Sequence, residues 1–199
     1  MTVASDPVAL LWRALDQTGA IISRVRPEQA SLPTPCRSFD VRALVNHVLR
    51  DVRLFTARAG GAAWEERGAD LIGDDWAGAY HQAAGALLAG WQRPGALDRT
   101  VQLPFGELPA LWFVGQQVTD LAVHAWDVAR ATGQPTDLDP ELGQFALDWG
   151  TGNLEPRFRG DEADGRDFGV EVPVADDAPL YDRLAGFFGR DPAPGPAGL

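Results

Sequence analysis

The segment from Leu108 to Trp126 constrains the fold most, because it is long and almost free of charge. It carries one formal charge, Asp120, and one histidine, His124. Apolar residues recur along it at helical spacing, on a stripe formed by Leu111, Val114, Val118, Leu121, Ala122 and Ala125. A second face is also largely apolar. Since a helix that is apolar on most sides is a buried helix, the segment predicts a helix at the centre of the protein.

Asp120 is the unusual residue of this segment. It stands four residues before His124, so in a helix the two side chains share one face, with Cβ atoms about 6 Å apart. A carboxylate placed in such a helix without a partner would cost several kcal/mol. A divalent metal ion shared with His124 would compensate the charge. A core histidine that is hydrogen-bonded to Asp120 or to a backbone carbonyl is the alternative, and spacing alone does not decide between them.

Further amphipathic segments predict an all-α protein. Apolar stripes at helical spacing mark helices over residues 5–25, 41–59, 74–92, 109–132, 139–153 and 179–190. Asp40 is placed to cap the second of these helices, and Gly133 to end the fourth. Residues 99–108 have the pattern of a short β-hairpin arm around Pro-Phe-Gly. We predict a helical bundle in one domain over residues 1–190, followed by a disordered tail over 191–199.

Composition excludes several classes of partner. The net charge of −11 and the lack of a basic stripe argue against binding to nucleic acid or to an anionic membrane surface. The single cysteine, Cys36, cannot build a disulfide framework, which favours a cytoplasmic protein. The N-terminus lacks the basic and long apolar parts of a signal peptide. The central apolar segment holds Asp120, His124 and two glutamines, so we do not expect it to span a membrane.

Two of the three histidines fall on helices that we expect to be neighbours. His47 lies at the edge of the apolar stripe of the 41–59 helix, so with Asp120 and His124 it would offer three metal ligands from two helices. Three protein ligands leave positions open for water or substrate, which is typical of a reactive metal site. His81 lies off the apolar stripe of its helix, and we expect it at the surface.

Three separated segments resemble the DinB-like metal-binding superfamily. They are TPCRSFDVRALVNH at 34–47, VQLPFG at 101–106 and VHAWDVARATGQP at 123–135. The most similar branch is the mycothiol-dependent maleylpyruvate isomerase-type metal-binding domain. This resemblance implies a DinB-like four-helix bundle with extra short helices, and a divalent ion, zinc or nickel, held by His47, Asp120 and His124. Enzymes of the branch often have glutamate at the position of Asp120, whose side chain is one methylene shorter.

The resemblance also implies a thiol-assisted reaction. The expected activity is S-transfer or isomerisation of a small electrophilic substrate, with mycothiol as co-substrate. A metal with open positions would lower the pKa of the bound thiol, and the thiolate would attack the substrate. We predict no catalytic residue beyond the metal ligands. Arg42 and Arg130 are candidates to hold a carboxylate of the thiol or substrate, with a solvated surface arginine as the alternative for both. Cys36, just before a helix N-terminus, is interpreted as a packing residue.

Other functions stay open at this stage, including whether the chain is an enzyme. One is a metal-binding bundle without catalysis, with a role in the stress response or in binding a small ligand. Another is a metal-free helical scaffold with a buried Asp120–His124 pair. A homodimer that forms through exposed apolar faces is a further alternative, since no feature of the sequence fixes the oligomeric state.

Overall fold

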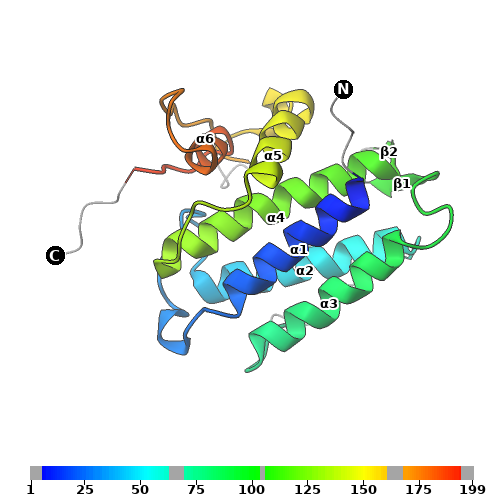
Figure 1. Ribbon diagram of the computed structural model, residues 1–199, viewed down its shortest axis with the longest axis horizontal. Coiled ribbons are helices and arrows are strands. Elements are labelled where there is room, and N and C mark those ends of the chain that lie inside the picture. Colours follow the sequence, from blue (N-terminus) through cyan, green and yellow to red (C-terminus); the bar gives the residue numbers. More distant parts are fainter. Residues whose placement is uncertain (1–5, 63–69, 104–105, 161–167, 194–199) are drawn as a thin grey trace.

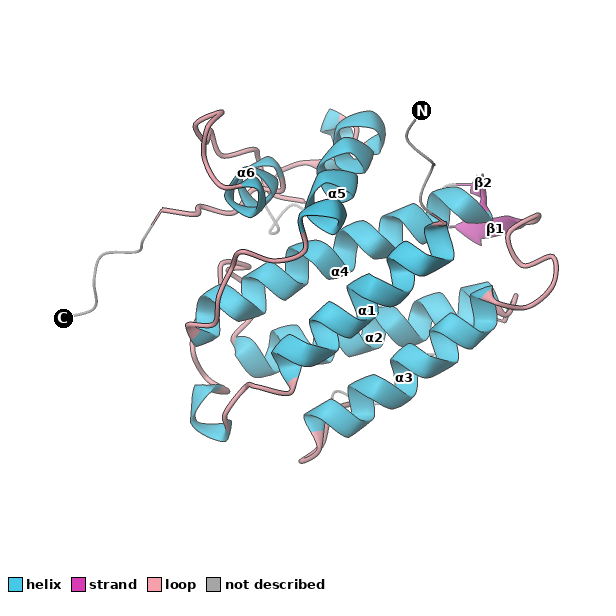
Figure 2. Ribbon diagram, viewed as in Figure 1, coloured by secondary structure: helices cyan, strands magenta, loops and turns pink. Residues whose placement is uncertain are grey.

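A computed structural model describes residues 6–62, 70–103, 106–160 and 168–193 (Figure 1). Within these residues the helices are α1 (Pro7–Ile22), α2 (Val41–Ala59), α3 (Trp76–Trp91), α4 (Ala110–Thr132), α5 (Pro140–Asn153) and α6 (Leu180–Phe187), with short 3-10 turns at Pro27–Gln29 and Pro156–Phe158. Strands β1 (Thr100–Leu103) and β2 (Gly106–Pro109) pair antiparallel, with Thr100 opposite Pro109. The prediction of an all-α bundle with a small hairpin arm is confirmed (Figure 2).

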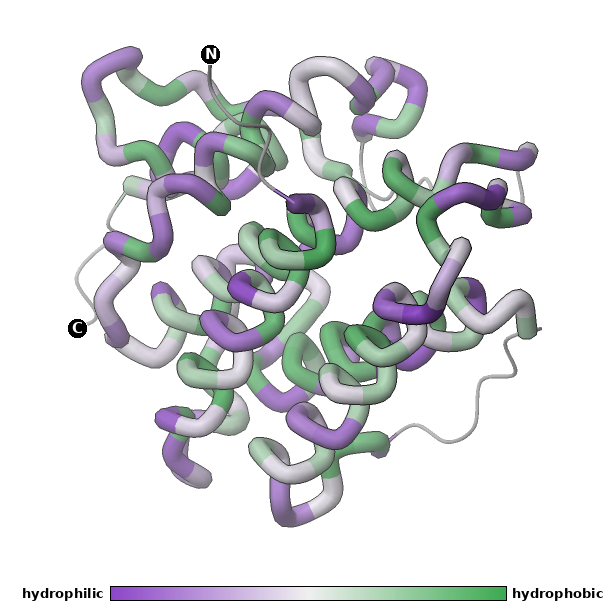
Figure 3. The backbone as a smooth tube through the Cα atoms, turned by 45° about the vertical axis from the view of Figure 1, so that its right-hand side comes forward, coloured by the Kyte–Doolittle hydropathy of each residue, from purple (hydrophilic) through white to green (hydrophobic). Residues whose placement is uncertain are grey.

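The first four helices form the bundle. α1 packs against α3 and α4, and α2 packs against the same two helices. Leu11, Leu44, Leu87 and Val118, one from each helix, are all part of the apolar core between them. The hydropathy-coloured backbone shows apolar and polar residues alternating around each helix, as expected when one side of a helix is buried (Figure 3).

Helix α4 is the central element, because it is covered on two sides. Its bundle side contributes Val118 to the main core, whereas Val123 and Trp126 belong to a second apolar cluster with α5 and α6 (Figure 1). The prediction of a buried central helix is therefore confirmed. Leu111 departs from the predicted stripe: it is 50 % exposed, since it lies in the first turn of α4, at the end of the bundle.

Local signals fix where the helices of the candidate site begin and end. The side chain of Asp40 accepts a hydrogen bond from the backbone N–H of Ala43 at 2.8 Å, which caps the start of α2 as predicted. α4 ends at Gly133, whose φ of 70° is left-handed and therefore suits a residue without a Cβ atom. These two caps fix where α2 begins and where α4 ends, and the site residues lie within these two helices.

Some expectations extend beyond what the structure describes. Residues 194–199 of the predicted disordered tail lie outside the described residues. Among the described helices, none combines the length and the apolar character that a membrane crossing requires.

Candidate metal centre

A cavity of about 410 Å³ lies between α2, α4 and the segments that flank them. The two helices turn polar stripes into it, with residues spaced four or seven apart so that they share one face. These stripes contain His47, Asp51 and Arg58 on α2, and Gln116, Asp120 and His124 on α4. Cys36, Trp149, Phe168 and Arg190 complete much of the remaining wall. The cavity therefore gathers imidazole, carboxylate, thiol and guanidinium groups in one place.

His47 reaches this cavity from the middle of α2. Its ring stacks on Phe39 with ring centroids 5.0 Å apart, and its centroid lies 5.0 Å from that of His124 in an edge-on arrangement. Burial, together with the neighbouring His124 and Arg50, lowers the pKa of His47 to about 3. The imidazole is therefore neutral near pH 7, and neutral imidazole is the form that binds metal ions.

His124 is held from behind by a buried carboxylate. Asp127 Oδ2 lies 3.1 Å from His124 Nδ1, and the same oxygen lies 3.1 Å from Arg190 Nη2. Although burial alone would raise the pKa of Asp127, Arg190 and His124 hold it below its usual range. With Nδ1 engaged, His124 directs Nε2 toward Asp120 Oδ1, at 3.7 Å. Carboxylate–histidine contacts of this kind commonly orient histidines that bind metals.

Asp51 makes a matching pair on the facing helix. Its Oδ2 lies 3.2 Å from His47 Nε2, so α2 carries His-x-x-x-Asp where α4 carries Asp-x-x-x-His. Burial and the nearby Asp120 raise the pKa of Asp51 to about 7. Burial also raises the pKa of Asp120, whose side chain is 25 % exposed. Two carboxylates thus line one cavity, where burial and their mutual repulsion disfavour the charged forms.

As they are arranged here, the described residues contain no group of three or more His, Cys, Asp or Glu side chains that could hold a metal ion. Each imidazole instead faces the carboxylate of its own helix. The chemistry of the donors nevertheless suits a divalent ion, because imidazole and carboxylate groups are common zinc ligands. On this criterion the residues fit the metal that the resemblance implies.

The spacing of the donors supports the same conclusion. Two ligands of one tetrahedral ion, each about 2.1 Å from it, have donor atoms about 3.4 Å apart. The distances within the two pairs, 3.2 Å and 3.7 Å, lie on either side of that value. Two imidazoles on one such ion would have ring centroids about 5 Å apart, and those of His47 and His124 are 5.0 Å apart.

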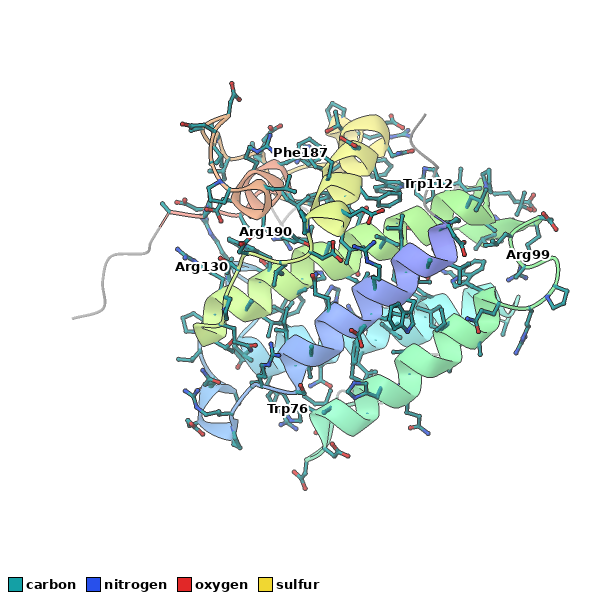
Figure 4. The ribbon with its side chains drawn as sticks, in the orientation of Figure 1. Trp76, Arg99, Trp112, Arg130, Phe187 and Arg190 are labelled. Carbon is teal, nitrogen blue, oxygen red and sulfur yellow. The ribbon has the colours of Figure 1, made fainter. Side chains whose placement is uncertain are left out.

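The arginines proposed from the sequence lie elsewhere. Arg42 Nη2 donates to Asp70 Oδ2 at 2.7 Å, and Arg130 Nη2 donates to the backbone oxygen of Pro192 at 3.0 Å. Neither side chain lines the cavity. Figure 4 shows Arg130 toward the end of α4 and Arg190 beside α6. The prediction that His81 lies at the surface is confirmed, since this residue is exposed.

Four charged residues of the site were not selected from the sequence: three that line the cavity, and Asp127, which contacts His124. Asp51 and Asp127 had a usable signal, because each lies three or four residues from a candidate histidine on the same helix. Arg58 lies seven residues after Asp51, on the same stripe of α2. Arg190 had no local signal, since it reaches the site only through the packing of α6 against α4. Cys36 packs against the main core, as interpreted, and also lines the cavity.

Comparison with known proteins adds a family relationship. Residues 11–129 match the family model described as the mycothiol maleylpyruvate isomerase N-terminal domain. Two uncharacterized proteins of Mycobacterium tuberculosis, from strains CDC 1551 / Oshkosh and ATCC 25618 / H37Rv, are each 37% identical to this chain over 187 residues. These alignments cover 93% of this chain and 98% of each relative. No solved structure matches.

Proposed function

Because the chain belongs to the mycothiol maleylpyruvate isomerase N-terminal domain family, we propose that it binds one divalent metal ion, zinc or nickel, through His47, Asp120 and His124. With this ion it would use mycothiol, or a similar small thiol, for S-transfer to or isomerisation of a small electrophilic substrate. The observation that carries the proposal is the meeting of two imidazoles and two largely buried carboxylates in one cavity. A cytoplasmic setting, where small thiols are kept reduced, fits this activity.

When bound, the ion would lower the pKa of a thiol and hold it as a thiolate near neutral pH. The chain itself prepares the site for this. Asp127 would accept a hydrogen bond from Nδ1–H of His124, which leaves Nε2 as the ring nitrogen for the ion. Phe39 stacks on His47 and fixes the plane of that ring. Trp149 and Phe168 line the cavity and would keep water from the reacting sulfur.

The cavity also offers a cation for an anionic part of the thiol or substrate. Arg58 lines it from α2, with its guanidinium carbon 5.8 Å from the centroid of the Phe113 ring. An arginine fork suits a carboxylate because it can donate two parallel hydrogen bonds. We propose Arg58 for this role. Arg42 and Arg130 stay predictions for the same role, and a homodimer stays a prediction as well.

Elemental analysis of the purified full chain tests the metal. We expect about one equivalent of zinc or nickel per chain, and loss of most of it in His47→Ala and His124→Ala. His81→Ala is the matched control, because His81 is exposed and outside the cavity. If the purified chain holds no metal and a chelator leaves its melting temperature unchanged, the result supports the metal-free scaffold with an Asp120–His124 pair and overturns the proposal.

A second experiment separates an enzyme from a binding protein. The metal-loaded chain is incubated with mycothiol and a chromogenic alkylating electrophile, and the consumption of thiol is followed. We expect a rate above that of the metal-free chain and of the His124→Ala variant. Bound metal without any gain in rate would support the non-catalytic metal-binding bundle and contradict the thiol chemistry.

A further inference from the structure

The pairing of His47 with Asp51 points to a metal site with one more protein ligand than the family resemblance implies. We propose that Asp51 is a fourth donor, so that each helix supplies one histidine and one aspartate. The inference rests on the proposed metal site, but it concerns a residue that neither the motif nor the comparisons single out. A fourth protein ligand would decide whether the resting metal site keeps a coordination position open for water or thiol.

The first support is geometric. Asp51 follows His47 by four residues, as His124 follows Asp120, so one turn of each helix brings an imidazole and a carboxylate together, and both pairs line one cavity. The Nε2–Oδ2 distance in the Asp51 pair is 3.2 Å, which is closer than the 3.7 Å in the Asp120 pair. An ion that binds His47 Nε2 from the cavity would therefore lie beside the Asp51 carboxylate.

The second support is charge. The side chain of Asp51 is 16 % exposed, less than that of Asp120, and the two carboxylates lie in one cavity. Arg50 Nε lies 3.6 Å from Asp51 Oδ1, but the side chain of Arg50 is itself 38 % exposed. Arg190 is engaged by Asp127. A divalent ion placed between Asp51 and Asp120 would neutralise both carboxylates, which one half-exposed arginine does poorly.

The consequence concerns access to the ion. Structural zinc sites have four protein ligands, whereas catalytic sites have three and keep a position for water or substrate. With Asp51 bound, an incoming thiol must replace this carboxylate or add as a fifth ligand. Asp51 would then set how readily the site accepts a thiol, while His47, Asp120 and His124 hold the ion throughout.

Metal titration of the full chain tests this role without any measurement of activity. Chelator-stripped protein is titrated with Co²⁺, whose visible absorption reports coordination, and zinc affinity is measured by competition with a coloured chelator. We expect Asp51→Asn to weaken affinity by at least about tenfold and to change the Co²⁺ spectrum, while Asp51→Glu retains most of the affinity. Asp16→Asn is the control, since it removes one carboxylate from the exposed side of a helix, α1.

The stability of the metal-free chain gives a second readout, for which the two possible roles of Asp51 predict opposite changes in melting temperature. If Asp51 is a ligand, Asp51→Asn relieves repulsion from Asp120. In chelator the variant should then melt at the same temperature as the wild type or higher. Added zinc should raise the melting temperature of the variant less than that of the wild type. If Asp51 only positions His47, the variant should melt lower in chelator and bind zinc as the wild type does, which would overturn the inference. If the wild-type chain binds no metal, the proposed function itself is overturned.

Discussion

The carboxylate of Asp127 lies 3.1 Å from Nη2 of Arg190, although the two residues are 63 positions apart in the sequence. Asp127 is completely buried and Arg190 is 8 % exposed. The same carboxylate oxygen lies 3.1 Å from Nδ1 of His124. The side chain of Asp127 thus connects the segment after α6 with an imidazole of the candidate metal centre.

This buried ion pair predicts a large cost for removing one partner. We expect Arg190→Ala to lower the free energy of unfolding by about 3–5 kcal/mol, because it leaves the buried Asp127 carboxylate without its guanidinium partner. Urea unfolding of the metal-free full chain measures it. Arg157→Ala is the control: this exposed arginine pairs with Glu155 at 2.7 Å, and its loss should cost less than about 1 kcal/mol. Similar losses in the two variants would contradict the assignment.

The pKa of Asp51 predicts a pH dependence in the metal-free chain. The native pKa is about 7 and the ordinary value is 3.8, so between these values native Asp51 keeps a proton that the unfolded chain has lost. Its contribution to stability is therefore lost as the pH rises through about 7. We expect Asp51→Asn to lose less free energy of unfolding than the wild type between about pH 5 and pH 8, as measured by urea unfolding in chelator.

The pKa of His47 predicts a pH dependence of stability with the opposite sign, which must be separated from that of Asp51. Its native pKa of about 3 lies below the ordinary 6.5, so its contribution is fully present above that ordinary value and is lost as the pH falls toward about 3. The difference between wild type and Asp51→Asn at each pH isolates Asp51. If this difference does not change with pH, the raised pKa of Asp51 is wrong.

Gly115 predicts a packing cost at the cavity wall. A Cβ atom at this position of α4 would come within 2.6 Å of the indole ring of Trp149. We expect Gly115→Ala to destabilise the chain by about 1–3 kcal/mol and to displace Trp149, as followed by unfolding and by near-ultraviolet circular dichroism. Gly85→Ala in α3 is the matched control, because a Cβ atom there meets nothing within 4 Å and should stabilise by about 0.5–1 kcal/mol. Destabilisation by both changes would contradict this account.

The position of Cys36 predicts that a reagent attached to its thiol would block the cavity. It lines both the candidate metal cavity and a second cavity of about 520 Å³ that also contains Arg190. We expect a bulky maleimide on Cys36 to weaken thiol binding to the metal-loaded chain, as measured by calorimetric titration, because it fills the shared space. Cys36→Ala should bind metal and thiol normally and be insensitive to the reagent. Unchanged thiol binding after complete labelling would disprove this placement.

The boundaries of two helices followed closely from the sequence. The predicted 41–59 and 109–132 helices match Val41–Ala59 and Ala110–Thr132, because Asp40 caps the start of the first and Gly133 ends the second. The first helix was predicted to run to residue 25 but ends at Ile22. Its apolar stripe continues past the end of the helix, and Pro27 then starts a separate 3-10 turn. Periodicity alone could not show that difference.

The residues of the candidate site were likewise predictable from the sequence only in part. His47, Asp120 and His124 were accessible to sequence analysis, because helical spacing decides which face of α2 or α4 they occupy. Arg190 was not, since its position depends on how α6 packs on α4. The contacts of Arg42 and Arg130 also depend on tertiary structure, with partners at Asp70 and Pro192.

The contact between Asp127 and Arg190 also limits how this protein can be shortened. The family match stops at residue 129, so a fragment cut to that boundary would keep the acidic side chain and discard its guanidinium partner. Expression trials that aim for a minimal version should place the cut beyond Arg190, and purification tags at the carboxyl end need a spacer that leaves this arginine undisturbed.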